Sequence, residues 1–177
     1  MEVGTLLLTS KLLHYCSSLF IMSLVTFQDK QRYGSSSDRF DSFDDSLEIE
    51  KITPILEKDF PNCEVVSKPY GPYGIDVVVR QNGKDVLWVD LERQFGWTGE
   101  YRYQHVSFLE RKFHFIEEAK RVGANFTMCW FNKNHTEFVL AHGEVIERYE
   151  SFDKTLRSGR VDRVRHIDLS DVIFRNS

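Results

Sequence analysis

The sequence predicts an α/β fold in which a mixed central β-sheet is flanked by helices. Two stretches carry the 3.6-residue apolar spacing of helices, residues 42–60 and the stretch from Ser107 to Gly123. Short apolar stretches typical of strands precede and follow the second of these. Helices that alternate with strands favour a sheet covered by helices. The 177 residues, 41% hydrophobic and 28% charged, suffice for one domain with its own core.

Residues 1–41 are predicted to be an N-terminal extension, flexible or mis-started, outside the core. Lys11 and His14 interrupt its apolar residues, so it lacks the roughly 18 consecutive apolar residues of a membrane helix. Glu2 stands where a signal peptide has a basic start. The residues from Met22 are more typical of the N-terminus of a soluble protein. We therefore expect that residues 1–21 either result from a start codon assigned too early or form a loosely docked helix. The Ser- and Asp-rich residues 28–42 favour a loop.

The predicted core spans residues 42–150 and begins with a helix over residues 42–60. Its apolar stripe includes Ile52 and Leu56, and Pro54 is a defect that is expected to kink or shorten it. A short strand follows at residues 63–67. Residues 68–74 form a loop with two prolines and two glycines.

Two apolar stretches, residues 75–80 and 85–94, are predicted to pair as a β-hairpin. Asn82 and Gly83 lie between them, and Asn-Gly favours a type I′ turn. Side chains alternate along a strand, so Asp90 and Glu92 share a face with Trp88. The apolar Leu87, Val89 and Leu91 share the opposite face.

The second helix is predicted to begin at Ser107, because Ser107 and Glu110 have the spacing of a capping box. Gly123 is a suitable end for it. Residues 126–131 and 136–141 are predicted to be strands joined by a turn. Residues 151–177 are predicted to be a polar, basic C-terminal segment.

Three carboxylates, Asp76, Asp90 and Glu92, lie on the two strands of the predicted hairpin. An unpaired buried carboxylate is unfavourable, and a divalent cation would compensate it. Magnesium prefers oxygen ligands, which points to metal-assisted phosphodiester chemistry with Mg²⁺ or Mn²⁺. In the alternative interpretation, Asp76 caps a turn while Asp90 and Glu92 face solvent on a half-exposed sheet.

The pattern of a helix acid, Gly-Ile-Asp, a hairpin, an apolar-x-apolar-acid strand and a helix resembles the PD-(D/E)xK nuclease superfamily. The resemblance covers roughly residues 44–131. It implies a restriction-endonuclease-like fold, with Asp76 as the first metal-binding acid and Asp90 as the second. Glu92 stands where the superfamily usually has lysine, and some members carry Glu or Gln there. Glu48 is the preferred extra metal-binding acid on the first helix, with Glu50 and Asp45 as rivals.

The resemblance implies a metal-dependent endonuclease that hydrolyses phosphodiester bonds in DNA. A virus or mobile element is a suitable source for such a small nuclease, and a homodimer is the expected assembly. Glu92 would help to activate water, and Lys112 would replace the absent strand lysine by reaching in from the second helix. The alternative is a catalytically inactive nuclease-fold protein that binds nucleic acid or assembles with partners. A third reading is a different α/β protein whose acids are surface residues.

The net charge of −4 means that any DNA contact must come from local basic patches. Arg111, beside Lys112, and Arg93, beside Glu92, are candidates near the acids. Basic residues recur in the C-terminal segment, and those expected to contact DNA there are Arg157, Arg160 and Arg163. A solvated charged face explains the same residues equally well.

The three cysteines are widely spaced and odd in number, which fits a reducing compartment. We therefore expect a cytoplasmic location, bacterial or in the host cell of a virus, with no secretion and no membrane insertion.

Overall fold

The computed structural model describes residues 45–71, 74–155, 159 and 161–177. The chain divides into two units, residues 1–43 with 70–74, and residues 44–69 with 75–177. The second unit contains every helix and strand considered below. The predicted extension over residues 1–41, as well as Arg157 and Arg160, lies outside the described residues.

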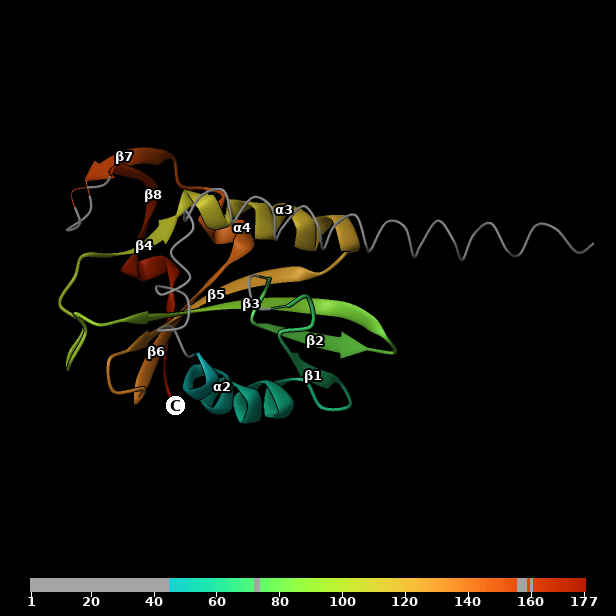
Figure 1. The fold of residues 1–177 in the computed structure, drawn as a ribbon. Coiled ribbons are helices and arrows are strands. Elements are labelled where there is room, and N and C mark those ends of the chain that lie inside the picture. Colours follow the sequence, from blue (N-terminus) through green and yellow to red (C-terminus); the bar gives the residue numbers. More distant parts are fainter. Residues whose placement is uncertain (1–44, 72–73, 156–158, 160) are drawn as a thin grey trace, which may run out of the picture. The chain divides into compact units, whose positions relative to one another are not determined.

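The second unit is a mixed α/β structure built on a six-stranded sheet (Figure 1). Strands β3 and β5 pair in parallel, and the other neighbouring pairs are antiparallel. In spatial order the strands are β1 (Glu64–Ser67), β2 (Val77–Gln81), β3 (Lys84–Gln94), β5 (Asn125–Asn132), β6 (Glu137–His142) and β9 (Ile173–Asn176).

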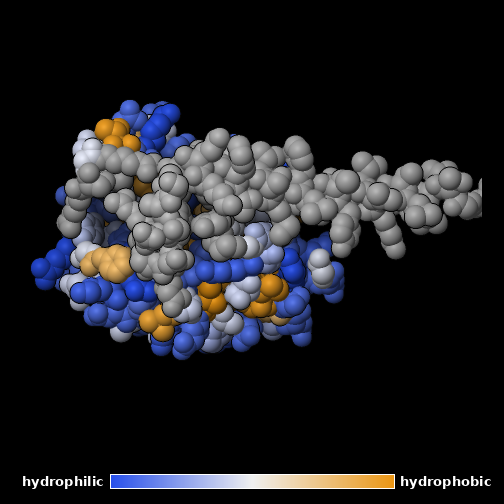
Figure 2. All heavy atoms as spheres, viewed as in Figure 1, coloured by the Kyte–Doolittle hydropathy of each residue, from blue (hydrophilic) through white to orange (hydrophobic). Residues whose placement is uncertain are grey.

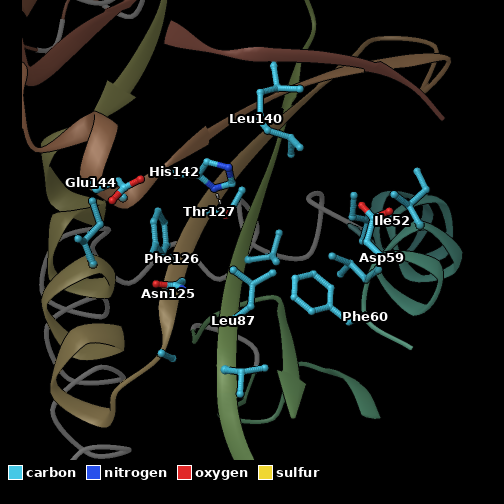
Figure 3. A pocket seen from close by; sticks show the side chains of 18 of the residues that line it. Ile52, Asp59, Phe60, Leu87, Asn125, Phe126, Thr127, Leu140, His142 and Glu144 are labelled. Carbon is cyan, nitrogen blue, oxygen red and sulfur yellow. Dashed lines mark hydrogen bonds between the residues drawn. The ribbon is translucent and has the colours of Figure 1, made fainter. Parts of the chain in front are cut away.

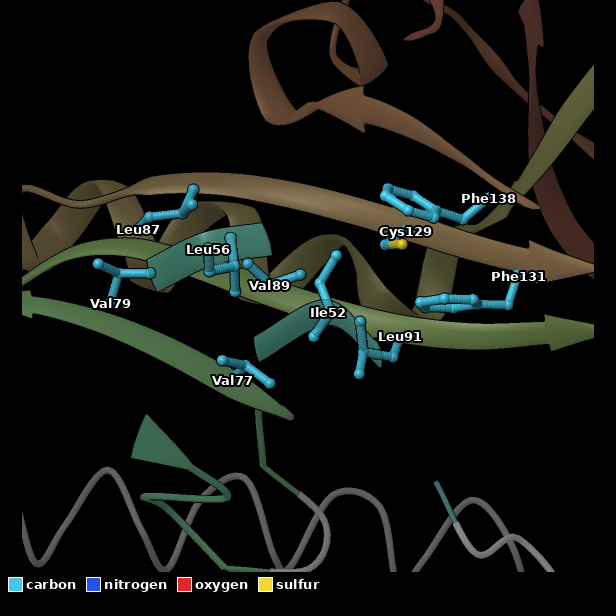
Figure 4. Packing of buried hydrophobic residues seen from close by; sticks show 10 residues of the cluster. All are labelled: Ile52, Leu56, Val77, Val79, Leu87, Val89, Leu91, Cys129, Phe131 and Phe138. Carbon is cyan, nitrogen blue, oxygen red and sulfur yellow. The ribbon is translucent and has the colours of Figure 1, made fainter. Parts of the chain in front are cut away.

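Helices α2 (Ser46–Asp59) and α3 (Phe113–Val122) cover opposite faces of this sheet (Figure 1). Under α2, the side chains of Ile52 and Leu56 pack onto alternate residues of β2 and β3 (Figure 4). These residues are Val77, Val79, Leu87, Val89 and Leu91, with Cys129, Phe131 and Phe138 completing the cluster. The predicted apolar face of residues 85–94 is therefore confirmed.

The predicted hairpin is confirmed, with β2 starting two residues later than expected. Asn82 and Gly83 have φ values of 52° and 74°. A type I′ turn requires positive φ at both central residues, which Asn and Gly adopt readily. Gly123 ends α3 in the left-handed region, as expected.

The prediction that a helix begins at Ser107 is wrong. Ser107 lies in strand β4 (His105–Leu109), and the 3₁₀ turn η2 (Glu110–Lys112) comes between β4 and α3. Val106 and Phe108 are buried while their neighbours are half-exposed, which is the period of a strand. Ser107 and Glu110 therefore have the spacing of a capping box, but Ser107 lies within a strand and caps no helix.

The prediction that residues 151–177 are only a polar segment is also wrong. This stretch contains β7 (Ser151–Thr155), β8 (Val161–Asp168), the short turn η3 (Leu169–Asp171) and β9. Strands β4, β8 and β7 form a second, antiparallel sheet in that order. The short helix α4 (Gly143–Ile146) leads from the large sheet toward the second one.

The remaining elements agree closely with the predicted ranges. Pro54 lies inside α2 without ending the helix. The visible face of the described residues is mainly hydrophilic, with small separate apolar patches (Figure 2). Within the described part of the chain, no helix is both long enough and apolar enough to cross a membrane.

Candidate functional site

Asp76 and Asp90 lie opposite each other at the point where β2 begins. The hairpin register pairs Val77 with Val89, so one further step places Asp76 opposite Asp90. Residues directly opposite in a sheet have Cβ atoms about 4.5–5.5 Å apart on one face. Val77 and Val89 face α2, so the two acids face the side that carries α3. Asp90 is buried, with 4% of its surface exposed.

Lys112 brings an ammonium group to these acids. Its Nζ lies 2.6 Å from Asp90 Oδ2 and 3.3 Å from Glu92 Oε2. Lys112 is the last residue of η2, so the turn between β4 and α3 aims it at β3. Burial lowers its pKa, but the charges of Asp90 and Glu92 outweigh burial and raise the pKa above its ordinary value. Lys112 is therefore charged at neutral pH.

Asp76 is the most strongly perturbed carboxyl of this group. Burial raises its pKa well above the ordinary value, and the neighbouring charge of Asp90 raises it further. The backbone N–H of Leu91 donates to Asp76 Oδ2 at 2.7 Å and opposes the shift. Burial and the neighbouring negative charge therefore both favour the protonated form of this carboxyl.

Asp45 and Lys68 extend the group. The Asp45 side chain is hydrogen-bonded to Asp76, and Lys68 Nζ lies 2.5 Å from Asp45 Oδ1. The sequence pattern offers Asp45 only as a rival to Glu48 for the helix acid, and it gives no signal for Lys68. Lys68 has a φ of 45°, which is uncommon for a residue other than glycine and is enriched where function constrains the backbone.

Glu92 lies at the exposed end of the group. Its side chain is 33% exposed, compared with 6% for Asp90, so water reaches its carboxylate. Strand alternation places it on the same face as Asp90, as predicted. The structure thus brings Asp76, Asp90, Glu92 and Lys112 together.

Glu48 lies apart from this group, on the face covered by α2. It is 2% exposed, and its two oxygens accept hydrogen bonds from Arg93 at 2.5 and 3.0 Å. His135 Nε2 lies 2.8 Å from Glu48 Oε1. Burial raises the pKa of Glu48, but the Arg93 and His135 hydrogen bonds prevail and leave it below its ordinary value. Glu48 is engaged in a buried ion pair and is not grouped with Asp76 and Asp90.

Three of the basic residues expected to contact DNA are described by the structure, and each of them lies beside an acid. Arg93 binds Glu48, Arg111 lies 3.8 Å from Asp162, and Arg163 lies 3.7 Å from Asp153. The Arg163 side chain is 61% exposed and remains open to solvent.

The residues present suit a magnesium ion in number and chemistry. Within the described residues, no group of three or more His, Cys, Asp or Glu side chains is arranged to hold a metal ion. Magnesium, however, is commonly held by one or two carboxylates together with waters and substrate phosphate. Asp76 and Asp90 supply two, and the raised pKa of Asp76 marks a place where added positive charge is favourable.

The cavity of about 580 Å³ shown in Figure 3 is separate from these acids. Ile52 of α2 and Phe60, the residue after α2, line it together with Leu87 and Leu140. Thr127 and His142, hydrogen-bonded at 2.9 Å, are among its polar lining residues. None of Asp76, Asp90, Glu92 and Lys112 lines it.

No family model matches this chain, and no curated protein matches it.

Proposed function

We propose that this chain is a divalent-metal-dependent endonuclease that hydrolyses phosphodiester bonds in DNA. The observation that carries the proposal is the position of Lys112, whose ammonium group lies between Asp90 and Glu92. The superfamily motif usually has a lysine where this chain has Glu92. Lys112 supplies an ammonium group at the same place. Within the large sheet and its helices, the chain runs through α2, the antiparallel strands β1 to β3, then α3 and the parallel strand β5, with β4 of the second sheet and η2 inserted before α3. This order supports a restriction-endonuclease-like fold as part of the proposal.

Charge balance supports a metal at this place. Asp76, Asp90 and Glu92 are three acids, and Lys112 is one base, so full ionisation leaves an excess of two negative charges. One Mg²⁺ or Mn²⁺ ion would balance that excess, held by Asp76 and Asp90. When bound, such an ion polarises a phosphoryl oxygen and lowers the pKa of a bound water.

The side chains of the chain would supply the remaining chemistry. Lys112 orients Asp90 through its 2.6 Å contact and offers positive charge to a phosphate oxygen. Glu92, the most exposed of the acids, is placed to accept a proton from an attacking water. Asp45 and the Leu91 N–H hold Asp76 in position.

Plasmid nicking tests the proposal. Wild-type protein should convert supercoiled plasmid to nicked or linear DNA with Mg²⁺ or Mn²⁺ and not with EDTA. Asp90→Asn should abolish this conversion, because Asp90 is a metal ligand and the partner of Lys112. Asp153→Asn is the matched control, since Asp153 is 72% exposed on β7.

Two results would overturn the proposal. Absence of cleavage by wild type with either metal would remove the enzymatic function, and DNA binding without cleavage would favour the inactive nuclease-fold alternative. Equal cleavage by wild type and Asp90→Asn would show that the active site lies elsewhere.

A further inference from the structure

A second polar cluster lies on the β4–β8–β7 sheet, outside the carboxylate site. The rings of His105 and His166 are stacked, with centroids 3.4 Å apart and planes 18° apart. Lys154 Nζ lies 3.1 Å from His166 Nε2 and 3.5 Å from Ser107 Oγ. The four residues come from all three strands of the sheet.

These side chains share one face, which is accessible to solvent. Ser107 pairs with His166 in the register, and His105 lies one pleat away. The intervening residues Val106 and Ile167 are buried on the opposite face. His105, Ser107, Lys154 and His166 are all partly exposed.

Lys154 is an ammonium whose partners are neutral. Asp162 stands opposite Lys154 in the register but lies beside Arg111 instead. Among the described residues, Lys154 forms hydrogen bonds to an imidazole nitrogen and a hydroxyl and no ion pair. Its positive charge is thus available to an anion.

The stacked imidazoles respond to the same charge. Burial, the neighbouring His105 and Lys154 lower the pKa of His166 to about 4. Burial and Lys154 also lower the pKa of His105, while Asp168 opposes the shift. The lowered pKa values favour neutral rings at pH 7. An anion placed among them would favour the protonated rings, because it would offset the repulsion between a protonated ring and Lys154.

We infer that His105, Ser107, Lys154 and His166 form a binding site for a phosphate group, and that this phosphate belongs to the DNA backbone. The second part of this inference rests on the proposed function. Lysine ammonium and serine hydroxyl groups are among the groups that contact DNA phosphates without reading sequence. The imidazole N–H groups add further donors beside them.

The position of the cluster in the chain fits DNA that also enters the carboxylate site. Ser107 is five residues from Lys112, so their Cα atoms are at most about 17 Å apart. At about 3.4 Å of axial rise per nucleotide along one strand, this distance spans at most about five nucleotides. The phosphate held here would thus lie close to the bond that is cut.

DNA binding as a function of salt tests the inference. We would measure the fluorescence anisotropy of a labelled duplex with the full chain in EDTA, between about 50 and about 200 mM salt. Loss of one phosphate contact in Lys154→Gln should weaken binding about eightfold at about 0.1 M salt and reduce the slope of log K against log salt by about 0.9. Lys154→Arg should retain both values.

Lys133→Gln is the matched control, because Lys133 is an exposed lysine in the turn between β5 and β6. It should leave affinity and slope unchanged, and thermal unfolding should show that each variant is folded. The free anion is the second possible source of the phosphate group. It is tested by titration with inorganic phosphate, observed through the NMR signals of His105 and His166.

The outcomes separate this inference from the proposed function. An unchanged slope in Lys154→Gln, or a wild type that does not bind DNA, overturns the assignment to the DNA backbone. If inorganic phosphate shifts the histidine signals while that slope is unchanged, the site binds free phosphate instead. A reduced slope together with no cleavage supports the phosphate site and overturns the enzymatic function alone.

Discussion

Lys112 enters the acidic group from a 3₁₀ turn, whereas the acids lie on the hairpin strands. A lysine at position 92 would share a face with Asp90, one pleat along β3. Lys112 places its Nζ at the same part of the sheet, within 2.6 Å of Asp90 and 3.3 Å of Glu92. An ammonium acts through its position in space, so its origin on a different element does not change what it can do.

Replacing Lys112 should destabilise the protein. Asp90 is 4% exposed, and Lys112→Met would leave it as a buried charge without its partner. Breaking a buried pair in this way typically removes about 3–5 kcal/mol of unfolding free energy. Urea unfolding in EDTA should show this loss, and Asp90→Asn combined with Lys112→Met should recover most of it.

Lys120→Met provides the comparison for this prediction. Lys120 also contacts a carboxylate, Glu147, but it is 58% exposed, so its loss should change stability by less than about 1 kcal/mol. If Lys112→Met were as stable as Lys120→Met, the buried pair would not be as described.

Asp76→Asn should stabilise the metal-free protein near neutral pH. The folded-state pKa of Asp76 is raised, so its contribution to stability is complete below the ordinary value of 3.8 and is lost as pH rises through the raised pKa. Asparagine avoids that loss and can still accept from the Leu91 N–H. In EDTA, the unfolding temperature of Asp76→Asn should be higher than that of wild type at pH 8. The two temperatures should converge near pH 4.

Glu48→Gln separates a structural role from metal binding. Removing this charge leaves Arg93 without its buried partner, so we expect a loss of about 3 kcal/mol of unfolding free energy. Glu50→Gln, on the exposed side of α2, should have little effect. Metal binding by folded Glu48→Gln should match wild type, and a large loss of metal affinity would instead place Glu48 among the ligands.

Side-chain alternation explains which site residues were predictable. Asp90 and Glu92 were placed on one face because strand parity is a local property, and the Asn-Gly turn identified the partner strand of Asp76. The Asp45–Asp76 contact joins residues 31 positions apart, so local patterns do not contain it. Local patterns also cannot choose between Glu48 and Asp45, because tertiary packing decides which acid at the start of α2 meets Asp76.

At the scale of elements, β4 shows how long-range pairing overrides a local motif. Ser107 in β4 and Glu110 just after β4 have the Ser-x-x-Glu spacing typical of helix starts, but β4 pairs with β8, about sixty residues later. The local pattern of residues 151–177 predicts only a polar segment, because charged residues recur along β7 and β8. The helices and the central hairpin were predictable because their apolar spacing is strong and local.

The second sheet should lose stability in mild acid. The pKa of His166 is lowered from 6.5 to about 4 in the folded chain, so the unfolded chain takes up this proton first as pH falls. Its stability contribution is complete above about pH 6.5 and is lost toward about pH 4. Lys154 and His105 oppose a charge on His166, whereas Asp168, which is paired with His105 in the register, favours a charge on His105.

His166→Gln should reduce this acid sensitivity. Between pH 7 and pH 4, the unfolding temperature should fall less for this variant than for wild type. His114→Gln, on α3, is the control, and its unfolding temperature should fall as much as that of wild type. Parallel curves of unfolding temperature against pH for His166→Gln and wild type would contradict the lowered pKa of His166.

For the whole molecule, the sheet separates two buried charge groups. The Glu48–Arg93 pair lies on the α2 face, and Asp90 with Lys112 lies on the face that carries α3. Arg93 balances the charge of Glu48, whereas Lys112 alone does not balance the acids around Asp90. This difference leads us to place the metal on the second group.

Magnesium should therefore stabilise the folded protein. A ligand present at ten times its dissociation constant adds about 1.4 kcal/mol of unfolding free energy when it binds the folded state alone. Thermal unfolding should shift upward with Mg²⁺ or Mn²⁺ in wild type and Asp153→Asn. It should not shift in Asp76→Asn with Asp90→Asn, and an equal shift in this double variant would place the metal elsewhere.

The most direct test of the central claim is the rate of plasmid nicking as a function of Mn²⁺ concentration. For wild type we predict a rate that rises and saturates with metal and is zero in EDTA. For the folded double variant, Asp76→Asn with Asp90→Asn, we predict no nicking at any concentration. A wild type that never nicks, or a double variant that nicks at the wild-type rate, would contradict the account.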